Sequence, residues 1–185
     1  MYTLYIDTHG LELVFVLFKD DTILDERRQV SEKHSRYAVA MLESLLSSNQ
    51  VTAEDLSLII VINGPGSFTG VRIGCVIAKI MSYTKNIPLK TLTYLQALNL
   101  SIDAEATLGI RDRNGVFVGK FDRNHELVSD YFYLSNQDLK KYSEEIIIDG
   151  EVDLNKVYLY MKEQMTINPH LLKPIYVKKI EVENG

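Results

Sequence analysis

The sequence contains a single cysteine, Cys75, among its 185 residues. One cysteine excludes an intramolecular disulfide and any zinc site built from several thiolates. Cys75 lies in a strongly apolar stretch, which favours a buried and unreactive thiol. The four histidines include no pair at the i, i+4 spacing of a helical metal site. We therefore expect no metal site in this chain.

An excess of positive charge and long apolar runs are also missing. Twenty lysines and arginines against 25 aspartates and glutamates give a formal net charge of −5, so no global basic field attracts nucleic acid. No apolar run approaches the length that spans a membrane, and Asp7 comes too early for a signal peptide. These absences predict a cytoplasmic protein without membrane contact.

The first half of the chain alternates between strand and helix patterns. Turn signals separate three apolar strands, and the short links between them predict an antiparallel meander. Ser31 is the expected N-cap of the first helix. The predicted order is strands Tyr2–Asp7, Leu11–Phe18 and Thr22–Val30, a helix that ends near Asn49, strand Leu58–Asn63, and helices Thr69–Tyr83 and Leu92–Leu100.

The second half repeats this order without repeating the sequence. The predicted elements are strands Thr107–Arg111, Val116–Phe121 and Glu126–Leu134, a short helix opened by Ser135 and Asp138, strand Ile146–Ile148, and helix Leu154–Met165. Two βββαβα units predict an α/β fold with the duplicated ribonuclease-H-like architecture of actin, heat-shock ATPases and sugar kinases. We expect an N-terminal lobe over residues 1–103 and a shortened C-terminal lobe over residues 104–185.

A glycine-rich turn joins strand Leu58–Asn63 to the apolar helix after it. Such a turn aims backbone N–H groups and a helix N-terminus at one point, which suits an anion or a close-packed partner. The spacing is one residue longer than the dinucleotide fingerprint, and no Gly-Lys-Ser/Thr follows. Ser67 and Thr69 fit an N-cap better than a nucleophile. The turn comprises Gly64, Pro65, Gly66, Ser67, Phe68, Thr69, Gly70 and Arg72.

The helix after the turn is apolar on nearly all sides, so it must be covered on two faces. Small residues recur along it at i, i+4, i+8 and i+12 from Gly70 to Ser82, a ridge that another backbone can approach closely. Either the first helix covers the second face, or the two helices together dock onto another protein. Both interpretations can also hold in part. The candidate interface is Tyr37, Met41, Leu42, Leu45, Gly70, Gly74, Ile77, Ala78 and Met81.

No catalytic constellation emerges from the sequence. Asp7 ends the first strand, where ATPases of this architecture keep a magnesium-site aspartate, but the bulky Leu11 and Glu12 replace the small residues of a phosphate-clasping hairpin. We interpret Asp7 as a degenerate ATPase position that hydrogen-bonds the local turn. Arg111, Asp112 and Arg113 either line an inter-lobe cleft or are ordinary turn charges.

The stretch from Gly64 to Gly74 resembles the signature of the bacterial TsaB (YeaZ) family. Ile6-Asp7-Thr8, His34 and Pro174–Lys178 match that family as well. The resemblance covers roughly the first half of the chain. Departures are Ile110–Arg113, where the family has an Ile-Asp-Ala-Arg-like stretch, Lys178 in place of an arginine, and the shortened second lobe.

The resemblance implies a non-catalytic relative of the subunit TsaD that pairs with it through two helices of each N-terminal lobe. With TsaE, the pair transfers a threonylcarbamoyl group to the adenosine beside the anticodon of ANN-decoding tRNAs. ATP or ADP and a metal are then expected in TsaD, with none bound tightly by this chain alone. Contact with tRNA is expected only through the complex, a nucleotide contact of the glycine turn stays a secondary possibility, and a homodimer is expected in isolation. The alternative is a stand-alone phosphotransferase or glycoprotease-like enzyme.

Overall fold

The structure is a computed structural model that describes residues 1–31, 33–102 and 104–177. Its larger sheet has the strand order β3-β2-β1-β4-β5. The first three strands form the expected antiparallel meander, and β4 and β5 run parallel to β1. The strands are β1 (Tyr2–Asp7), β2 (Glu12–Lys19), β3 (Thr22–Val30), β4 (Leu56–Ile62) and β5 (Leu89–Leu92).

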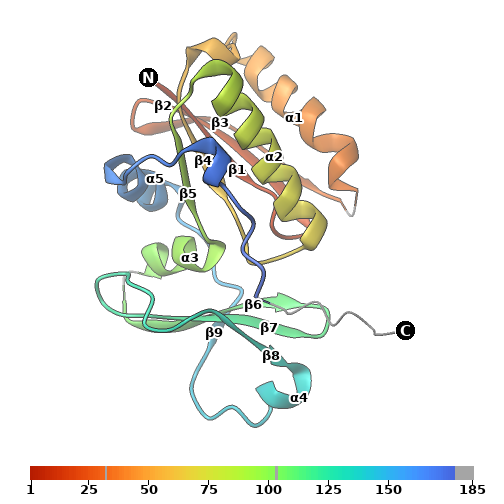
Figure 1. Ribbon diagram of the computed structural model, residues 1–185, viewed down its shortest axis with the longest axis vertical. Helices are drawn as coiled ribbons and strands as arrows, with labels where there is room; N and C mark the ends of the chain where they lie inside the picture. The colour runs from red at the N-terminus through yellow and green to blue at the C-terminus, as the bar shows by residue number, and fades with distance from the viewer. Residues whose placement is uncertain (32, 103, 178–185) are drawn as a thin grey trace.

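Helices cover both faces of this sheet (Figure 1). The helices α1 (His34–Ser48) and α2 (Phe68–Lys85) lie side by side on one face, over a core that includes Leu4, Ile6 and Phe15. On the other face lie α3 (Tyr94–Ile102) and α5 (Leu154–Glu163). Because β4 is buried on both faces from residue 58 onward, residues 58–62 form a continuous apolar run that does not alternate.

The second sheet has the strand order β8-β7-β6-β9. When the strands of each unit are numbered along the chain, this order is third, second, first, fourth, as it is for β3-β2-β1-β4 in the larger sheet. The helix α3 packs against both sheets and separates them (Figure 1). This repetition confirms the duplicated architecture. The remaining elements are β6 (Ala106–Asp112), β7 (Gly115–Phe121), β8 (Phe132–Ser135), β9 (Ile147–Ile148), α4 (Asn136–Leu139), and the 3-10 turns η1 (Ala53–Asp55) and η2 (Pro169–Leu171).

The last helix, α5, packs onto the larger sheet although it follows the second sheet in sequence. The Tyr158 ring stacks on Phe18 with centroids 4.5 Å apart. Buried Lys90 of β5 donates hydrogen bonds from Nζ to the carbonyl oxygens of Met161 and Lys162, at 2.8 and 2.7 Å. The C-terminal part of the chain thus completes the core of the N-terminal sheet.

Several expected element boundaries were wrong. Ser31 does not cap α1, because its Oγ accepts a hydrogen bond from the backbone N–H of Lys33, and the helix begins at His34 without a side-chain cap. The strand β5 was missed, since its four residues carry no period-2 pattern and their pairing with β4 is non-local. The expected strand Glu126–Leu134 is confined to β8, and Met165 is exposed beyond the end of α5. Asp103 and Lys178 lie outside the described residues.

Candidate docking face and inter-lobe cleft

The glycine turn is held by two distant segments of the same chain. The backbone N–H of Ser67 donates to the carbonyl of His9 at 2.7 Å, and the N–H of Ile175 donates to the carbonyl of Asn63 at 2.8 Å. A Cβ added at Gly66 would lie 2.4 Å from the His9 oxygen, so this close approach needs glycine. Gly64 and Pro65, joined by a cis peptide bond, are buried beside them. The turn fixes the entry angle of α2.

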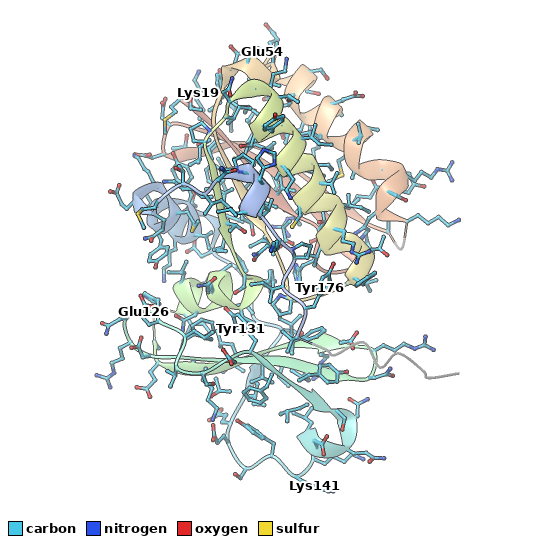
Figure 2. The ribbon with its side chains drawn as sticks, viewed as in Figure 1. Lys19, Glu54, Glu126, Tyr131, Lys141 and Tyr176 are labelled. Carbon is cyan, nitrogen blue, oxygen red and sulfur yellow. The ribbon has the colours of Figure 1, made fainter. Side chains whose placement is uncertain are left out.

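Of the two residues predicted as N-caps, Ser67 and Thr69, Ser67 caps α2, and Thr69 lies in the first turn of the helix. The Ser67 hydroxyl accepts a hydrogen bond from the backbone N–H of Gly70 at 3.3 Å. Phe68 and Thr69 are exposed in the first turn of the helix. The Arg72 guanidinium lies 3.7 Å from the Phe68 ring centroid, and its Nε donates to the Tyr176 hydroxyl at 2.7 Å. This cluster ties the C-terminal segment to the start of α2, where Figure 2 labels Tyr176.

The ridge of small residues on α2 faces the protein's own sheet. The Thr8 hydroxyl donates to the carbonyl of Gly70 at 2.7 Å and accepts from the N–H of Gly74 at 3.2 Å. A Cβ at Gly74 would lie 2.5 Å from Thr8 Oγ1, and Ala78 is fully buried. The backbone that approaches this ridge is therefore the turn after β1, and these three residues are not available to a partner.

Three further residues expected at the interface belong to the core. Met41, Leu42 and Leu45 of α1 are buried against the sheet. Only three of the expected residues are partly exposed, namely Tyr37, Ile77 and Met81. The expected interface therefore needs correction: six of its nine residues are covered by the chain itself.

The outer side of α2 carries an exposed apolar stripe instead. We define the α2 stripe as Val76, Ile80 and Tyr83, which are 53%, 56% and 60% exposed, together with the half-buried Ile77. Val39 of α1 is also exposed, at 57%. The sequence interpretation missed Val39, Val76, Ile80 and Tyr83. Once the small residues are assigned to the inner side, the helical period places the large apolar residues outside.

Asp7 and His9 form a buried pair at the end of β1. Asp7 Oδ1 accepts hydrogen bonds from the backbone N–H of His9 at 3.0 Å and from His9 Nδ1 at 2.7 Å. Asp7 thus makes the local turn contact that the sequence predicts. The His9 ring stacks on Tyr94 of α3 with centroids 3.7 Å apart. Burial first, and then the Asp7 charge, raise the pKa of Tyr94 to about 12.

Two cavities flank this pair. One, of about 580 Å³, is lined by Asp7, His9 and Tyr94 and by the segment Gly150–Leu154 that leads into α5. The other, of about 420 Å³, brings Arg111, Asp112 and Arg113 of the β6–β7 hairpin to His9 and Ser67. These hairpin charges therefore line a cleft between the lobes. Arg111 is paired with Asp149 at 2.9 Å, and Asp112 accepts a hydrogen bond from the Tyr133 hydroxyl at 3.0 Å.

Neither a metal cluster nor an exposed nucleophilic thiol is found in the described part of the chain. No three histidine, cysteine, aspartate or glutamate side chains gather there in a way that would hold a metal ion. Cys75 is buried, and burial raises the pKa of its thiol to about 11. In the same ranges, no helix is long and apolar enough to cross a membrane.

The two βββαβα units and the cleft between them define a two-lobed α/β protein of the duplicated ribonuclease-H-like class. YeaZ from Pseudomonas aeruginosa has the same fold, with a TM-score of 0.76 at 16% identity, over 95% of this chain and all of that one. By sequence, part of the chain is similar to proteins of the TsaB (YeaZ) family. It is 37% identical over 99 residues to the tRNA threonylcarbamoyladenosine biosynthesis protein TsaB of Bacillus subtilis.

The sequence matches are confined to part of the chain. The Bacillus subtilis match covers 53% of this chain and 43% of that protein. A Mycoplasma pneumoniae protein described as the uncharacterized MG208 homolog is 38% identical over 81 residues, which is 42% of this chain and 41% of its own length. The chain thus aligns with less than half the length of these relatives. The family model for TsaD, tRNA N6-adenosine threonylcarbamoyltransferase, matches residues 27–111.

Proposed function

We propose that this chain is a non-catalytic subunit that binds and activates TsaD in tRNA threonylcarbamoyladenosine biosynthesis. The product would be threonylcarbamoyl adenosine beside the anticodon of ANN-decoding tRNAs, with TsaE as a further partner. The observation that carries the proposal is the exposed α2 stripe in a chain whose sequence is similar to TsaB proteins. Exposed apolar residues that follow one face of a helix are typical of a helix-to-helix interface.

The geometry of α2 supports the docking of a second helix pair. The inner side of α2 is fully used by Thr8 and the sheet, so the outer side is the only one left for a partner within the described residues. Ile80 and Tyr83 stand one turn apart on it, as anchors in such an interface would. ATP or ADP and a metal would then belong to TsaD.

The test is co-purification with the TsaD protein of the same genome. Ile80→Asp places a charge in the centre of the proposed interface, where an unpaired buried charge costs several kcal/mol. Val128→Asp is the matched control, because Val128 is an equally exposed apolar residue, at 65%, between β7 and β8. We expect Ile80→Asp to lose TsaD and Val128→Asp to retain it. Retention of TsaD by both variants would contradict the proposed surface.

The alternatives predict different results for the pure protein. A stand-alone phosphotransferase would bind ATP and magnesium in calorimetry without TsaD, which we do not expect from this chain. A homodimer through the α2 stripe would sediment as a dimer, and Ile80→Asp would convert it to a monomer. Adding TsaD would then replace the homodimer, because one stripe cannot contact two partners at once.

A further inference from the structure

The charges on α2 have one sign, although the chain as a whole is acidic, with a formal net charge of −5. The helix carries Arg72, Lys79 and Lys85 and no acidic residue among its 18 residues. Lys85, at its end, forms an ion pair with Glu54. Arg72 and Lys79 form no ion pair in the part of the chain that the structure describes. Their two positive charges are therefore open to a partner.

Arg72 and Lys79 lie along one edge of the α2 stripe. They are about two helical turns apart, which is roughly 10 Å along the helix axis. The helical period places both beside Val76, and it places Ile77 at the opposite edge of the stripe. The Nε of Arg72 donates to the Tyr176 hydroxyl at 2.7 Å, and Lys79 is half-buried. Both cations are thus positioned before a partner arrives.

A second copy of this chain is a poor occupant of the α2 stripe. Its own α2 offers no carboxylate to Arg72 or Lys79. Its α1 adds one exposed acidic residue, Glu43, and one exposed basic residue, Arg36, which cancel in net charge. Two copies joined through these helices would therefore bring like charges together, which costs free energy. A partner with carboxylates along the matching edge would gain attraction from the same two cations.

A nucleic acid suits this surface less well than a protein does. Sites for nucleic acid are polar and depend on many contacts between cations and phosphates. Here two cations border exposed aliphatic side chains, Val76 and Ile80, which offer nothing to a phosphate. An apolar centre with a charged rim is instead the usual anatomy of a protein interface.

We propose that Arg72 and Lys79 select the partner of the α2 stripe. This inference rests on the proposed function, in which the stripe is a docking surface. The selected partner is a helix whose apolar face is edged by carboxylates about two turns apart. The same two cations disfavour the pairing of two copies of this chain.

The first test compares how salt changes two associations of the full-length chain. The affinity for the TsaD protein of the same genome is measured by calorimetry at about 50 and about 300 mM sodium chloride. It should weaken about fivefold at the higher salt, the order expected for screening two exposed ion pairs. Self-association of the pure chain, measured by sedimentation in the same buffers, should not weaken, because salt screens a repulsion there. Self-association that weakens with salt, or an affinity for TsaD that does not, would overturn the proposal.

The second test changes the charges one at a time. Lys79→Glu should weaken the binding of TsaD about tenfold at low salt, because it replaces an attraction by a repulsion. Arg72→Gln should weaken it about threefold, whereas Arg72→Lys keeps the charge and should bind within about twofold of the unmodified chain. Lys141→Glu is the control and should bind unchanged. Lys141 is an exposed lysine that Figure 2 shows at the far end of the second lobe.

The variant Ile80→Asp distinguishes this inference from the proposed function. If it loses TsaD while Lys79→Glu and Arg72→Gln bind as the unmodified chain does, the docking surface stands and the charge selection is overturned. If the unmodified chain does not bind TsaD, the proposed function fails and the charge selection fails with it. Binding of tRNA by the pure chain that Lys79→Glu abolishes would also overturn the choice of an acidic helix.

Discussion

The Thr8 hydroxyl accepts a hydrogen bond from the backbone N–H of Gly74 at 3.2 Å, across the contact between the β1–β2 turn and α2. The same hydroxyl donates to the carbonyl of Gly70 one turn earlier. A threonine thus inserts into the side of a helix where only glycine leaves enough space. This contact decides which side of α2 faces inward and, as a consequence, which apolar residues remain outside.

Gly74→Ala should destabilise the protein, although alanine favours helices. The added Cβ would lie 2.5 Å from Thr8 Oγ1, so the helix or the turn must shift. Such overpacking costs roughly 1–3 kcal/mol, more than the gain of about 1 kcal/mol from helix propensity. Urea unfolding measures the change. In a Thr8→Ala background the cost should shrink, and equal costs in both backgrounds would show that the two residues do not clash.

The variants Leu45→Ala and Val39→Ala should differ in stability, because Leu45 is buried and Val39 is exposed on α1. Leu45 is fully buried and should lose about 2–5 kcal/mol of unfolding free energy, whereas 57% exposed Val39 should change it by less than about 0.5 kcal/mol. Thermal and urea unfolding of the two variants make the comparison. A small loss for Leu45→Ala would contradict the placement of α1 on the sheet.

Cys75 should be unreactive in the native protein. Cys75 is 4% exposed, and burial raises the pKa of its thiol from 9.0 to about 11. The thiolate, which is the reactive form, is therefore nearly absent at neutral pH. Ellman's reagent should label Cys75 only after guanidinium unfolding, and rapid labelling of the folded chain would contradict this burial.

The same thiol should make stability depend on alkaline pH. Because its pKa is raised on folding, its stabilising contribution is complete below the unfolded pKa near 9.0 and is lost as the pH rises through about 11. The Cys75→Ala variant lacks this titration. Its unfolding free energy should fall less steeply over that interval than that of the unmodified chain, as pH-dependent urea unfolding would measure.

Lys90→Met should be more harmful than Lys162→Met. Lys90 Nζ satisfies two carbonyl oxygens at the end of α5, and unsatisfied buried acceptors cost about 1–3 kcal/mol. Lys162 makes an exposed ion pair with Asp21 at 2.7 Å, which contributes at most about 1 kcal/mol. The rate of amide hydrogen exchange in α5 should rise in Lys90→Met and stay unchanged in Lys162→Met. Equal losses of unfolding free energy in the two variants would argue against a capping role of Lys90 at the end of α5.

Local patterns predicted most elements because their signals lie within a few residues. The β4 run, the Ser67 cap and the Ser135 cap each depend on neighbours in sequence. The candidate interface was less accurate. α2 is apolar on nearly all sides, and its periodicity therefore does not say which side is buried. From the sequence alone, the space beside Gly70 and Gly74 suited the backbone of a partner as well as it suited Thr8 of the same chain.

By itself, the sequence determined most of the strands and helices, the repeated βββαβα order and the turn that leads into α2, because hydrophobic periodicity and turn chemistry act locally. Only the tertiary structure decided that Thr8 fills the glycine ridge and that the α2 stripe stays outside. It also brought Asp7, His9 and Tyr94 into one cleft. These contacts join residues that are distant along the chain, and only the packing of the complete fold gives them their distances.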